Sequence, residues 1–300
     1  MASNPTNPAK VPAPDSTVPL DRAETDALIR AALDEDLRYG PDATSVATVD
    51  ESARSVAKIV ARKPGVIAGA DIPAWTLAQL TDPENFTVES VADGTRVQPG
   101  HVVATISAPT RTLLTAERTF LNLITHASGI ATATSHWVDA VLGTGARIRD
   151  SRKTLPGMRN LQKFAVSVGG GVNHRYGLGD QAMIKDNHVI AAGGVVEALR
   201  KVRAAYPDLW CEVEVDTLEQ LDAILAERPD QVLLDNFELW QTQIAVQRRD
   251  QLSPRTTLES SGGLTLDVAR NYATCGVDYL AVGGLTHTVT ALDLGLDFED

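Results

Sequence analysis

Short apolar runs alternate with amphipathic stretches through the second half of the chain, from Gly145 onward. Six of these runs have the length and composition of buried strands. The candidate strands are residues 146–150, 182–185, 211–215, 231–235, 256–260 and 279–284. The helical stretches between them carry apolar residues at intervals of three and four, as a helix packed against a sheet requires. Strand, helix and strand at this spacing predict a parallel α/β sheet.

The number of strands bears on which parallel architecture is formed. An eight-unit α/β barrel usually needs about 250 residues, and only six units are visible between residues 146 and 284. We therefore expect an irregular, incomplete α/β barrel, with a doubly wound sheet as the alternative. In both architectures, ligands bind at the carboxyl ends of the strands.

The first half of the chain combines helices with short antiparallel strands, which predicts a second kind of domain. The expected elements are a helix over 21–39, a hairpin over 54–67, a helix over 70–80, short strands within 86–106, and helices over 112–126 and 130–142. Residues 1–20 are rich in Pro, Ser and Asn and are expected to form a disordered leader. We assign residues 21–128, completed by 286–300, to an N-terminal α/β sandwich domain and residues 129–285 to the barrel.

Charge is distributed unevenly along the chain. The whole sequence has a formal net charge of -12, yet residues 146–188 hold eight Lys and Arg against three Asp. A basic concentration within an acidic protein indicates a site that attracts a small anionic ligand. Most of these bases stand beside Gly, Pro and Asn, so turns are expected to present them. Arg159 and Lys163 instead fit a solvated basic face of a helix over residues 156–168.

The same composition argues against several function classes. Binding to nucleic acid needs a broad basic surface, and this chain has only one local basic cluster. Cys211 and Cys275 lie far apart and in no CxxC motif, so reduced thiols and a cytoplasmic location are expected. No apolar run approaches membrane-spanning length, so no membrane partner is expected.

Charged residues and glycines follow the six candidate strands, where the carboxyl ends of parallel strands should meet. In chain order these are Arg152 and Lys153, Lys185, Glu214, Asp235, Ser261 with Gly262 and Gly263, and Gly283 with Gly284. Asp235 alone would be compatible with a structural cap on the following turn. Bases, acids and glycine turns on one rim together indicate a multiply charged ligand bound with a divalent cation.

Two parts of that ligand are indicated by separate groups of residues. The glycine pairs after the last two strands offer backbone N–H groups to a phosphate, although ordinary tight turns also need glycine. Arg152, His174 and Arg175 suit a planar carboxylate, because a guanidinium group binds a carboxylate through two hydrogen bonds. His174 and His188 would alternatively ligate zinc, but no third His or Cys stands at ligand spacing.

Longer motifs distributed over most of the chain resemble one enzyme family. They are LDEDLRYGPDATS (33–45), AERTFLNLITHASGIAT (116–132), DSRKTLPGMR (150–159), GGGVNHRYGLGD (169–180), IKDNH (184–188), CEVEV (211–215), LLDN (233–236), ESSGG (259–263) and VGGLTH (282–287). In this order, from about Asp21 to the C-terminus, they resemble the quinolinate phosphoribosyltransferase family. Ser151, where the family often has Thr, and Gly284, where it often has Ala, are small departures.

The resemblance implies an N-terminal α/β sandwich followed by an irregular, incomplete α/β barrel. It also implies that quinolinate and phosphoribosyl pyrophosphate react, with Mg²⁺ as cofactor, to give nicotinate mononucleotide, pyrophosphate and CO₂ in de novo NAD synthesis. The implied active unit is a homodimer in which Arg118 reaches the site of the neighbouring subunit. Assembly into higher oligomers is compatible with the resemblance.

The resemblance further implies a role for each site residue. The quinolinate carboxylates would be bound by Arg118, Arg152, His174 and Arg175, with Lys153 and Lys185 near the ring and the phosphates. Glu214 and Asp235 would flank the ribose and Mg²⁺. The 5′-phosphate turns would be formed by Ser261, Gly262, Gly283 and Gly284, and Gly263 and His287 would also bind substrate.

Two other functions stay open at this point. A related phosphoribosyltransferase of the same fold would act on another acidic heterocycle. A non-catalytic phosphate-binding barrel would need the phosphate turns, but it would not need two acids opposite a basic carboxylate pocket.

Overall fold

The structure is a computed structural model, and it describes residues 17–299 of the 300-residue chain. The leader expected over residues 1–20 therefore lies almost entirely outside the described residues. The described chain divides into two compact units. We call His136–Lys153 with Gly171–Gly283 the barrel unit, and the remaining described residues the sandwich unit.

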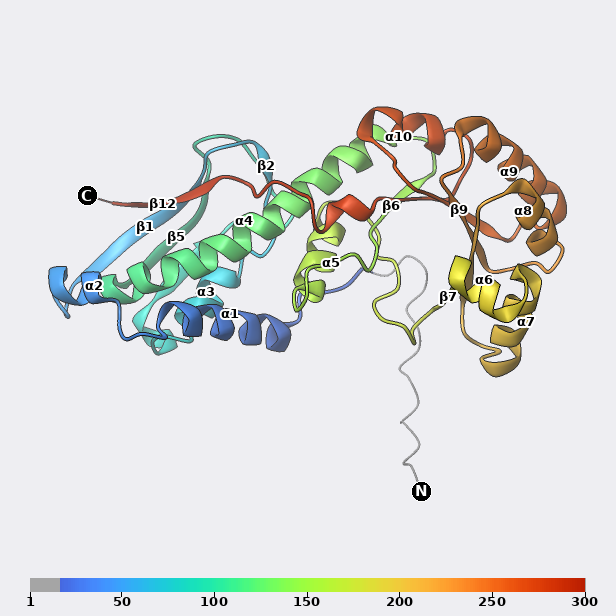
Figure 1. Ribbon diagram of the computed structural model, residues 1–300. Coiled ribbons are helices and arrows are strands. Elements are labelled where there is room, and N and C mark those ends of the chain that lie inside the picture. Colours follow the sequence, from blue (N-terminus) through green and yellow to red (C-terminus); the bar gives the residue numbers. More distant parts are fainter. Residues whose placement is uncertain (1–16, 300) are drawn as a thin grey trace, which may run out of the picture. The chain divides into compact units, whose positions relative to one another are not determined.

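Six parallel strands form the sheet of the barrel unit (Figure 1). They are β6 (Arg147–Arg149), β7 (Ala182–Ile184), β8 (Cys211–Val215), β9 (Gln231–Asp235), β10 (Thr257–Ser261) and β11 (Tyr279–Ala281). Each coincides with a candidate strand to within a few residues, so the predicted parallel α/β sheet is confirmed.

The order of these strands shows an opened barrel. Across the sheet the order is β6-β11-β10-β9-β8-β7, which is the chain order closed into a ring and cut between β6 and β7. A doubly wound sheet would instead reverse its order at a switch point. A single parallel bridge joins Arg149 of β6 to Val172, on the side of β6 away from β11. The incomplete barrel is thus the observed architecture.

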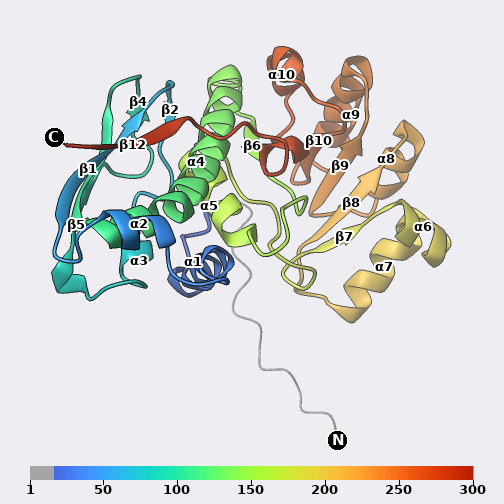
Figure 2. The same ribbon diagram turned by 60° about the vertical axis from the view of Figure 1, so that its left-hand side comes forward.

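Helices cover one face of this sheet, as Figure 2 shows for the yellow to orange part of the chain. They are α6 (Asp186–Ala192), α7 (Val195–Ala205), α8 (Leu218–Leu225), α9 (Leu239–Leu252) and α10 (Leu266–Ala273). Helix α8 illustrates the packing, because Leu221, Ile224 and Leu225 are buried at intervals of three and four positions. The other face of the sheet, inside the barrel, carries polar residues such as Glu214, Asp235 and Glu259 beside a few apolar ones.

The sandwich unit contains an antiparallel sheet of order β12-β1-β5-β3 and a separate two-stranded pair. The strands are β1 (Arg54–Ala61), β3 (Thr87–Ser90), β5 (Val102–Pro109) and β12 (Leu294–Phe298), with β2 (Gly65–Val66) paired to β4 (Arg96–Val97). Alternate residues of β1, namely Ala57, Ile59 and Ala61, are fully buried, as expected for a strand with one face on a core.

The remaining elements are helical. They are α1 (Arg22–Asp36), α2 (Ala43–Thr48), α3 (Ile72–Leu77), α4 (Thr110–Ala140), α5 (Arg159–Val168), and the 3₁₀ turns η1 (Pro83–Asn85) and η2 (Gly283–Leu285). Helix α1 begins where the sequence indicated, because the Asp21 carboxylate accepts a hydrogen bond from the Glu24 N–H. Among the described residues, no helix is long and apolar enough to cross a membrane.

The expected hairpin over residues 54–67 is wrong. Strand β1 pairs with β5 on one side and β12 on the other, while β2 pairs with β4. Strand β1 ends at Ala61, and Pro64 and Gly65 lead into β2 without turning the chain back onto β1. The alternation along β1 correctly indicated a half-buried strand, but periodicity carries no information about which segment becomes the neighbour.

The two helices expected over 112–126 and 130–142 are one continuous helix, α4. Gly129, which we took as part of a break, lies in its interior for a packing reason. A Cβ at Gly129 would lie 2.4 Å from the Thr290 carbonyl oxygen and 3.0 Å from the Ala291 Cα. Glycine therefore permits the close approach of residues 290–291 and does not end the helix.

The solvated basic face expected on the helix over 156–168 is also wrong in part. Helix α5 begins at Arg159, and the whole Lys163 residue is 0% exposed. Residues on several sides of α5 are buried, including Leu161, Gln162 and Ala165. The helix is buried on several sides, so a charged position did not mark a solvent face here.

We expect Gly129→Ala to destabilise the protein by about 1–3 kcal/mol, because the added methyl group would overlap backbone atoms that have no free space. Alanine favours a helix interior over glycine by about 1 kcal/mol, so this value is net of a partial gain. Urea unfolding measures the change. Gly179→Ala is the control, since a Cβ there meets no atom within 4 Å. An unchanged or higher unfolding free energy for Gly129→Ala would contradict this account of the packing.

Candidate active site

A pocket of about 340 Å³ lies at the carboxyl ends of the barrel strands. It brings together residues that are separated by more than a hundred positions in the sequence. The sequence-predicted residues that line it are Arg152, Lys153, His174, Arg175, Lys185, Glu214, Asp235, Ser261 and Gly283. Parallel strands deliver their carboxyl ends to one rim, which explains the convergence.

Arg152 and Arg175 both line this pocket, and their positive charges repel each other. Burial lowers the pKa of Arg175, and the positive charge of Arg152 lowers it further. Arg175 Nη1 donates to the Gln181 carbonyl oxygen at 3.1 Å, whereas the buried Nε of Arg152 has no hydrogen-bond partner among the described residues. Like charges held together with an unpaired donor form a preorganised site for an anion.

Two carboxylates stand on neighbouring strands of the same rim. Glu214 of β8 lies opposite Leu233 of β9, and Asp235 is two residues beyond Leu233, so both carboxylates project from one face of the sheet. Glu214 Oε2 accepts from Lys185 Nζ at 2.6 Å. Burial raises the pKa of Asp235, and the negative charge of Asp216 acts in the same direction. A bound cation would relieve both unfavourable effects on the Asp235 carboxylate.

The donor chemistry of these two side chains fits Mg²⁺. Mg²⁺ prefers oxygen ligands, and it is commonly held by one or two carboxylates together with substrate phosphates. Glu214 and Asp235 supply carboxylate oxygens beside a pocket that is also lined by Lys153 and Lys185. They are the residues of this rim that would hold the cation.

The turn after β10 requires glycine. Gly262 and Gly263 have φ of +95° and +59°, which L-residues other than glycine rarely adopt. A Cβ at Gly262 would also lie 2.2 Å from Asn236 Oδ1. Among the described residues, neither glycine donates its backbone N–H to another residue. Consecutive free N–H groups in such a turn form a concave site for a phosphate oxygen.

The glycine pair after β11 is arranged differently. Gly283 lines the pocket, and a Cβ there would lie 3.2 Å from the Lys153 Cδ, so the Lys153 side chain passes close to its backbone. Gly284 belongs to the sandwich unit and has no positive φ. His287 lies in the same unit and is exposed. The structure therefore places Gly283 in the pocket lining and does not place Gly284 or His287 there.

Arg118 and His188 also lie outside this lining. Arg118 is an exposed residue on α4, in the sandwich unit. His188 lies in the first turn of α6, where its Nδ1 accepts from the Lys185 N–H at 3.0 Å. His188 thus helps to cap α6, and it does not belong to the group of possible metal ligands that contains His174.

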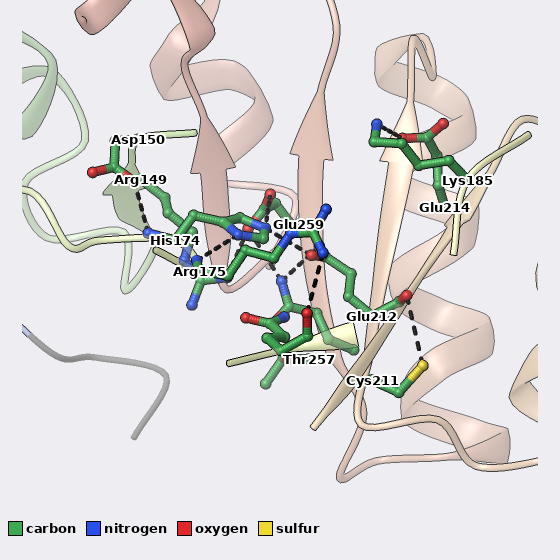
Figure 3. A network of polar contacts seen from close by, with 12 residues as sticks. Arg149, Asp150, His174, Arg175, Lys185, Cys211, Glu212, Glu214, Thr257 and Glu259 are labelled. Atoms are coloured by element: carbon green, nitrogen blue, oxygen red, sulfur yellow. Dashed lines mark hydrogen bonds and ion pairs between the residues drawn. The ribbon is translucent and has the colours of Figure 1, made fainter. Parts of the chain in front are cut away.

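A buried polar network extends below the pocket, toward the amino ends of the strands (Figure 3). Arg149 Nη1 donates to Glu259 Oε2 at 2.8 Å, and the guanidinium lies 3.6 Å from the centre of the Tyr279 ring. Gln231 Nε2 donates to Glu212 Oε1 at 2.9 Å and to Glu259 Oε2 at 3.1 Å. The Lys185–Glu214 pair lies apart from this network in the same view.

His174 joins the network to the pocket. Its Nε2 lies 2.7 Å from Glu212 Oε2, and its Nδ1 accepts from the Arg175 N–H at 2.7 Å. The backbone N–H of His174 donates to Asp150 Oδ1 at 2.7 Å, while Asp150 Oδ2 accepts from Asn173 Nδ2. We expected His174 to bind a ligand carboxylate, but both of its ring nitrogens are engaged within the protein.

The charges of the network are strongly interdependent. Burial opposes charge on His174, but the carboxylates of Glu212 and Glu259 outweigh it and raise the pKa of the imidazole. Burial likewise opposes charge on Glu212, yet His174 and Arg149 hold the pKa of that carboxyl below its ordinary value. Burial and the charge of Glu212 raise the pKa of Glu259. Glu212 is therefore the carboxylate that ionises first.

Sequence reasoning missed Arg149, Glu212, Gln231 and Glu259. A signal existed, because Glu212 and Glu259 stand two positions before Glu214 and Ser261, on the same face of their strands. His174, Glu212 and Glu259 form the one group within residues 17–299 that is compact enough to hold a metal ion. Their atoms already form hydrogen bonds and an ion pair with one another and with Arg149, so we assign no metal to them.

Comparison with known proteins places this geometry in context. Residues 42–128 match the family model for the quinolinate phosphoribosyl transferase N-terminal domain, and residues 130–297 match that for its C-terminal domain. The chain is 62% identical over 270 residues to the carboxylating nicotinate-nucleotide pyrophosphorylase of Mycobacterium leprae, covering 90% of this chain and 95% of that protein. It is 39% identical over 265 residues to a probable enzyme of the same name from Bacillus subtilis, covering 88% and 89%.

Solved structures agree with this similarity. The nicotinate-nucleotide pyrophosphorylase of Francisella tularensis superposes with a TM-score of 0.88 at 33% identity, covering 95% of this chain and 99% of that chain. The corresponding protein of Ehrlichia chaffeensis gives 0.85 at 34% identity, covering 91% and 98%.

Proposed function

The chain belongs to the quinolinate phosphoribosyltransferase family, and we propose that it joins quinolinate to the ribose of phosphoribosyl pyrophosphate. The products are nicotinate mononucleotide, pyrophosphate and CO₂, and the reaction serves de novo NAD synthesis. In enzyme class the protein is a pentosyltransferase. The proposal extends to the residues that carry the reaction, to Mg²⁺ and to the assembly of subunits.

One observation carries the proposal. A single pocket combines two mutually repelling arginines, one with a buried donor that is unpaired among the described residues, with two carboxylates on neighbouring strands, and a glycine turn directly follows its lining residue Ser261. The arginines suit an acidic ring, the carboxylates suit a ribose that becomes positively charged, and the turn suits a phosphate. A simple phosphate-binding barrel would need only the last of these features.

The chain's own residues stabilise the charge that develops during transfer. Departure of pyrophosphate leaves positive charge on the ribose, and the carboxylates of Glu214 and Asp235 face that charge. Lys153 and Lys185 neutralise the phosphates of the substrate. Mg²⁺, when it is bound by the two carboxylates and the substrate oxygens, supplies further neutralisation of the leaving group. The protein contributes mainly positioning and electrostatics.

Decarboxylation follows from the chemistry of the ring. The ring nitrogen forms a bond to the ribose carbon as the bond from that carbon to pyrophosphate breaks. The bond from the adjacent ring carbon to its carboxylate then breaks as CO₂ leaves, and its electron pair stays on that carbon, where the neighbouring positive nitrogen stabilises it. The carbon uses this pair to take up a proton from solvent. No redox cofactor enters this balance.

The assembly and location are further parts of the proposal. Arg118 is exposed on α4 and does not line the pocket of the barrel unit, which supports a role for it at the site of a second copy of the chain. The active unit is then at least a homodimer. Cys211 and Cys275 are free thiols, the state expected in the cytoplasm.

The first test compares quinolinate with nicotinate, which lacks the carboxylate beside the ring nitrogen. Release of CO₂ from quinolinate should require both phosphoribosyl pyrophosphate and Mg²⁺. We expect kcat/KM to be about 10⁴-fold lower for nucleotide formation from nicotinate, because donors of the Arg152 and Arg175 pair would stay unpaired. Values within tenfold of each other would indicate a phosphoribosyltransferase of broader specificity. Phosphate binding without turnover of either acid would indicate a non-catalytic barrel.

The second prediction concerns Glu214→Gln and Asp235→Asn. Each variant should lower kcat by about 10²-fold or more, because loss of one group that stabilises transition-state charge typically has this effect. The Kd for quinolinate, measured by calorimetry, should change much less, since these acids face the ribose and the cation. Wild-type turnover in both variants would reduce Glu214 and Asp235 to caps at the ends of their strands.

The third prediction tests whether Arg118 acts in a neighbouring subunit. Arg118→Ala and Lys185→Ala chains should each be inactive alone, because each lacks one part of every site. After subunit exchange, a mixed dimer should regain one site in which both residues are intact. Activity of the mixture is the measurement, and Arg118→Ala chains mixed with themselves are the control. A mixture that stays inactive after exchange has been verified by mass spectrometry would contradict the shared site.

A further inference from the structure

We propose that Glu212 is a positioning residue that fixes the tautomer of His174, and through it the backbone of Arg175 at the mouth of the pocket. The proposal rests on the proposed function, because it concerns how the quinolinate-binding side of the pocket is built. It assigns a role to a carboxylate that the transfer chemistry itself does not use.

The first step is a count of donors and acceptors around Glu212. This side chain is 0% exposed, and its two oxygens each receive one contact. Oε2 lies 2.7 Å from His174 Nε2, and Oε1 accepts from Gln231 Nε2 at 2.9 Å. An ionised carboxylate only accepts hydrogen bonds, so both partners must present an N–H. His174 is therefore protonated at Nε2.

The second step concerns the other ring nitrogen. His174 Nδ1 lies 2.7 Å from the Arg175 backbone nitrogen, and that N–H points to it. Nδ1 must then carry a lone pair, because an N–H at Nδ1 would meet the N–H of Arg175 at this distance. The two contacts together define one neutral tautomer, with the proton on Nε2 and the acceptor on Nδ1.

The third step connects this tautomer to ligand binding. A continuous path runs from Gln231 through Glu212 and His174 to the Arg175 backbone, and the Arg175 side chain lines the pocket. Figure 3 shows His174 between Glu212 and Arg175. Asp150 holds the same segment from its other side by accepting the His174 N–H. His174 thus links Glu212 in the barrel interior to the Arg175 backbone, and it holds that backbone in place.

Protonation of His174 should break this path. The groups that face the imidazole are Glu212 on β8, Glu259 on β10 and Arg149 on β6. Burial and Arg149 oppose its charge, but the two carboxylates prevail and raise the pKa above the ordinary value of 6.5. As the pH falls through this raised pKa, Nδ1 gains a proton and can no longer accept the Arg175 N–H. The KM for quinolinate should therefore rise on the acid side.

The decisive variant is Glu212→Gln, which keeps the size of the side chain and removes its charge. The single oxygen of the new amide can still accept from His174, but the NH₂ group of that amide then faces the NH₂ group of Gln231. One donor must stay unsatisfied, which disfavours the observed arrangement. Glu259→Gln is the matched control. It removes a carboxylate from the same buried network, but that carboxylate lies 3.7 Å from His174 Nε2 and leaves the 2.7 Å contact in place.

Long-range ¹H–¹⁵N spectra of the imidazole rings supply the direct readout. The His174 signals are identified by their loss in His174→Asn. In the full-length wild type above the His174 pKa, we expect the neutral form protonated at Nε2. Glu259→Gln should keep this form and Glu212→Gln should lose it. A wild-type His174 protonated at Nδ1 at every pH from 6 to 9 would overturn the proposal, whether or not the variants fold.

Kinetics supply the second readout. Glu212→Gln should raise the KM for quinolinate by about tenfold while changing the KM for phosphoribosyl pyrophosphate by less than about twofold. It should also flatten the acid-side rise in the quinolinate KM, because Nδ1 no longer accepts the Arg175 N–H in the variant and its protonation has no contact left to break. Equal rises in both KM values with an unmoved pH profile would show a merely structural role. If the wild type does not convert quinolinate, the proposed function fails, while the spectra still decide the tautomer.

Discussion

The ionised carboxylate of Glu212, enclosed in the barrel interior, sets the constraint on which the rest of the site depends. A buried charge is tolerated only where donors and counter-charges surround it. His174 and Gln231 donate to Glu212, and the positive charge of Arg149 stabilises it. These partners come from three different strands or loops of one unit. Satisfying this single charge therefore fixes the relative position of segments that end at the rim of the pocket.

The rim shows the opposite electrostatic arrangement. In the network below the pocket, His174 is paired with Glu212 and Arg149 with Glu259, whereas at the pocket Arg152 and Arg175 repel each other and Asp235 is partly desolvated and near the like charge of Asp216. Such an arrangement is unfavourable for the empty protein, and an oppositely charged ligand relieves it. In the proposed function, these arginines and carboxylates would suit a ligand that carries both carboxylates and a sugar with developing positive charge.

Local sequence patterns predicted a secondary-structure element correctly where the periodicity of one segment determines it. They failed where contacts with a second segment determine the structure. The six parallel strands and the N-terminus of α1 at Asp21 follow from apolar runs and a capping carboxylate. The hairpin over residues 54–67 failed because the partners of β1 are β5 and β12. The break in α4 failed because Gly129 serves a close contact with Thr290. The charge of Lys163 was misleading because α5 is buried on several sides.

The sequence by itself determined the residue types at the ends of the strands, and hence the rim that holds Arg152, Lys185, Glu214 and Asp235. Parallel strands bring these ends together whatever the details of packing. Only the tertiary structure decided what lies beneath that rim. Burial of Glu212 and Glu259, the pairing of Arg149, and the engagement of both His174 nitrogens depend on distances between strands. Hydrogen bonds in a dry interior are set by contacts between remote segments, and no local pattern specifies those contacts.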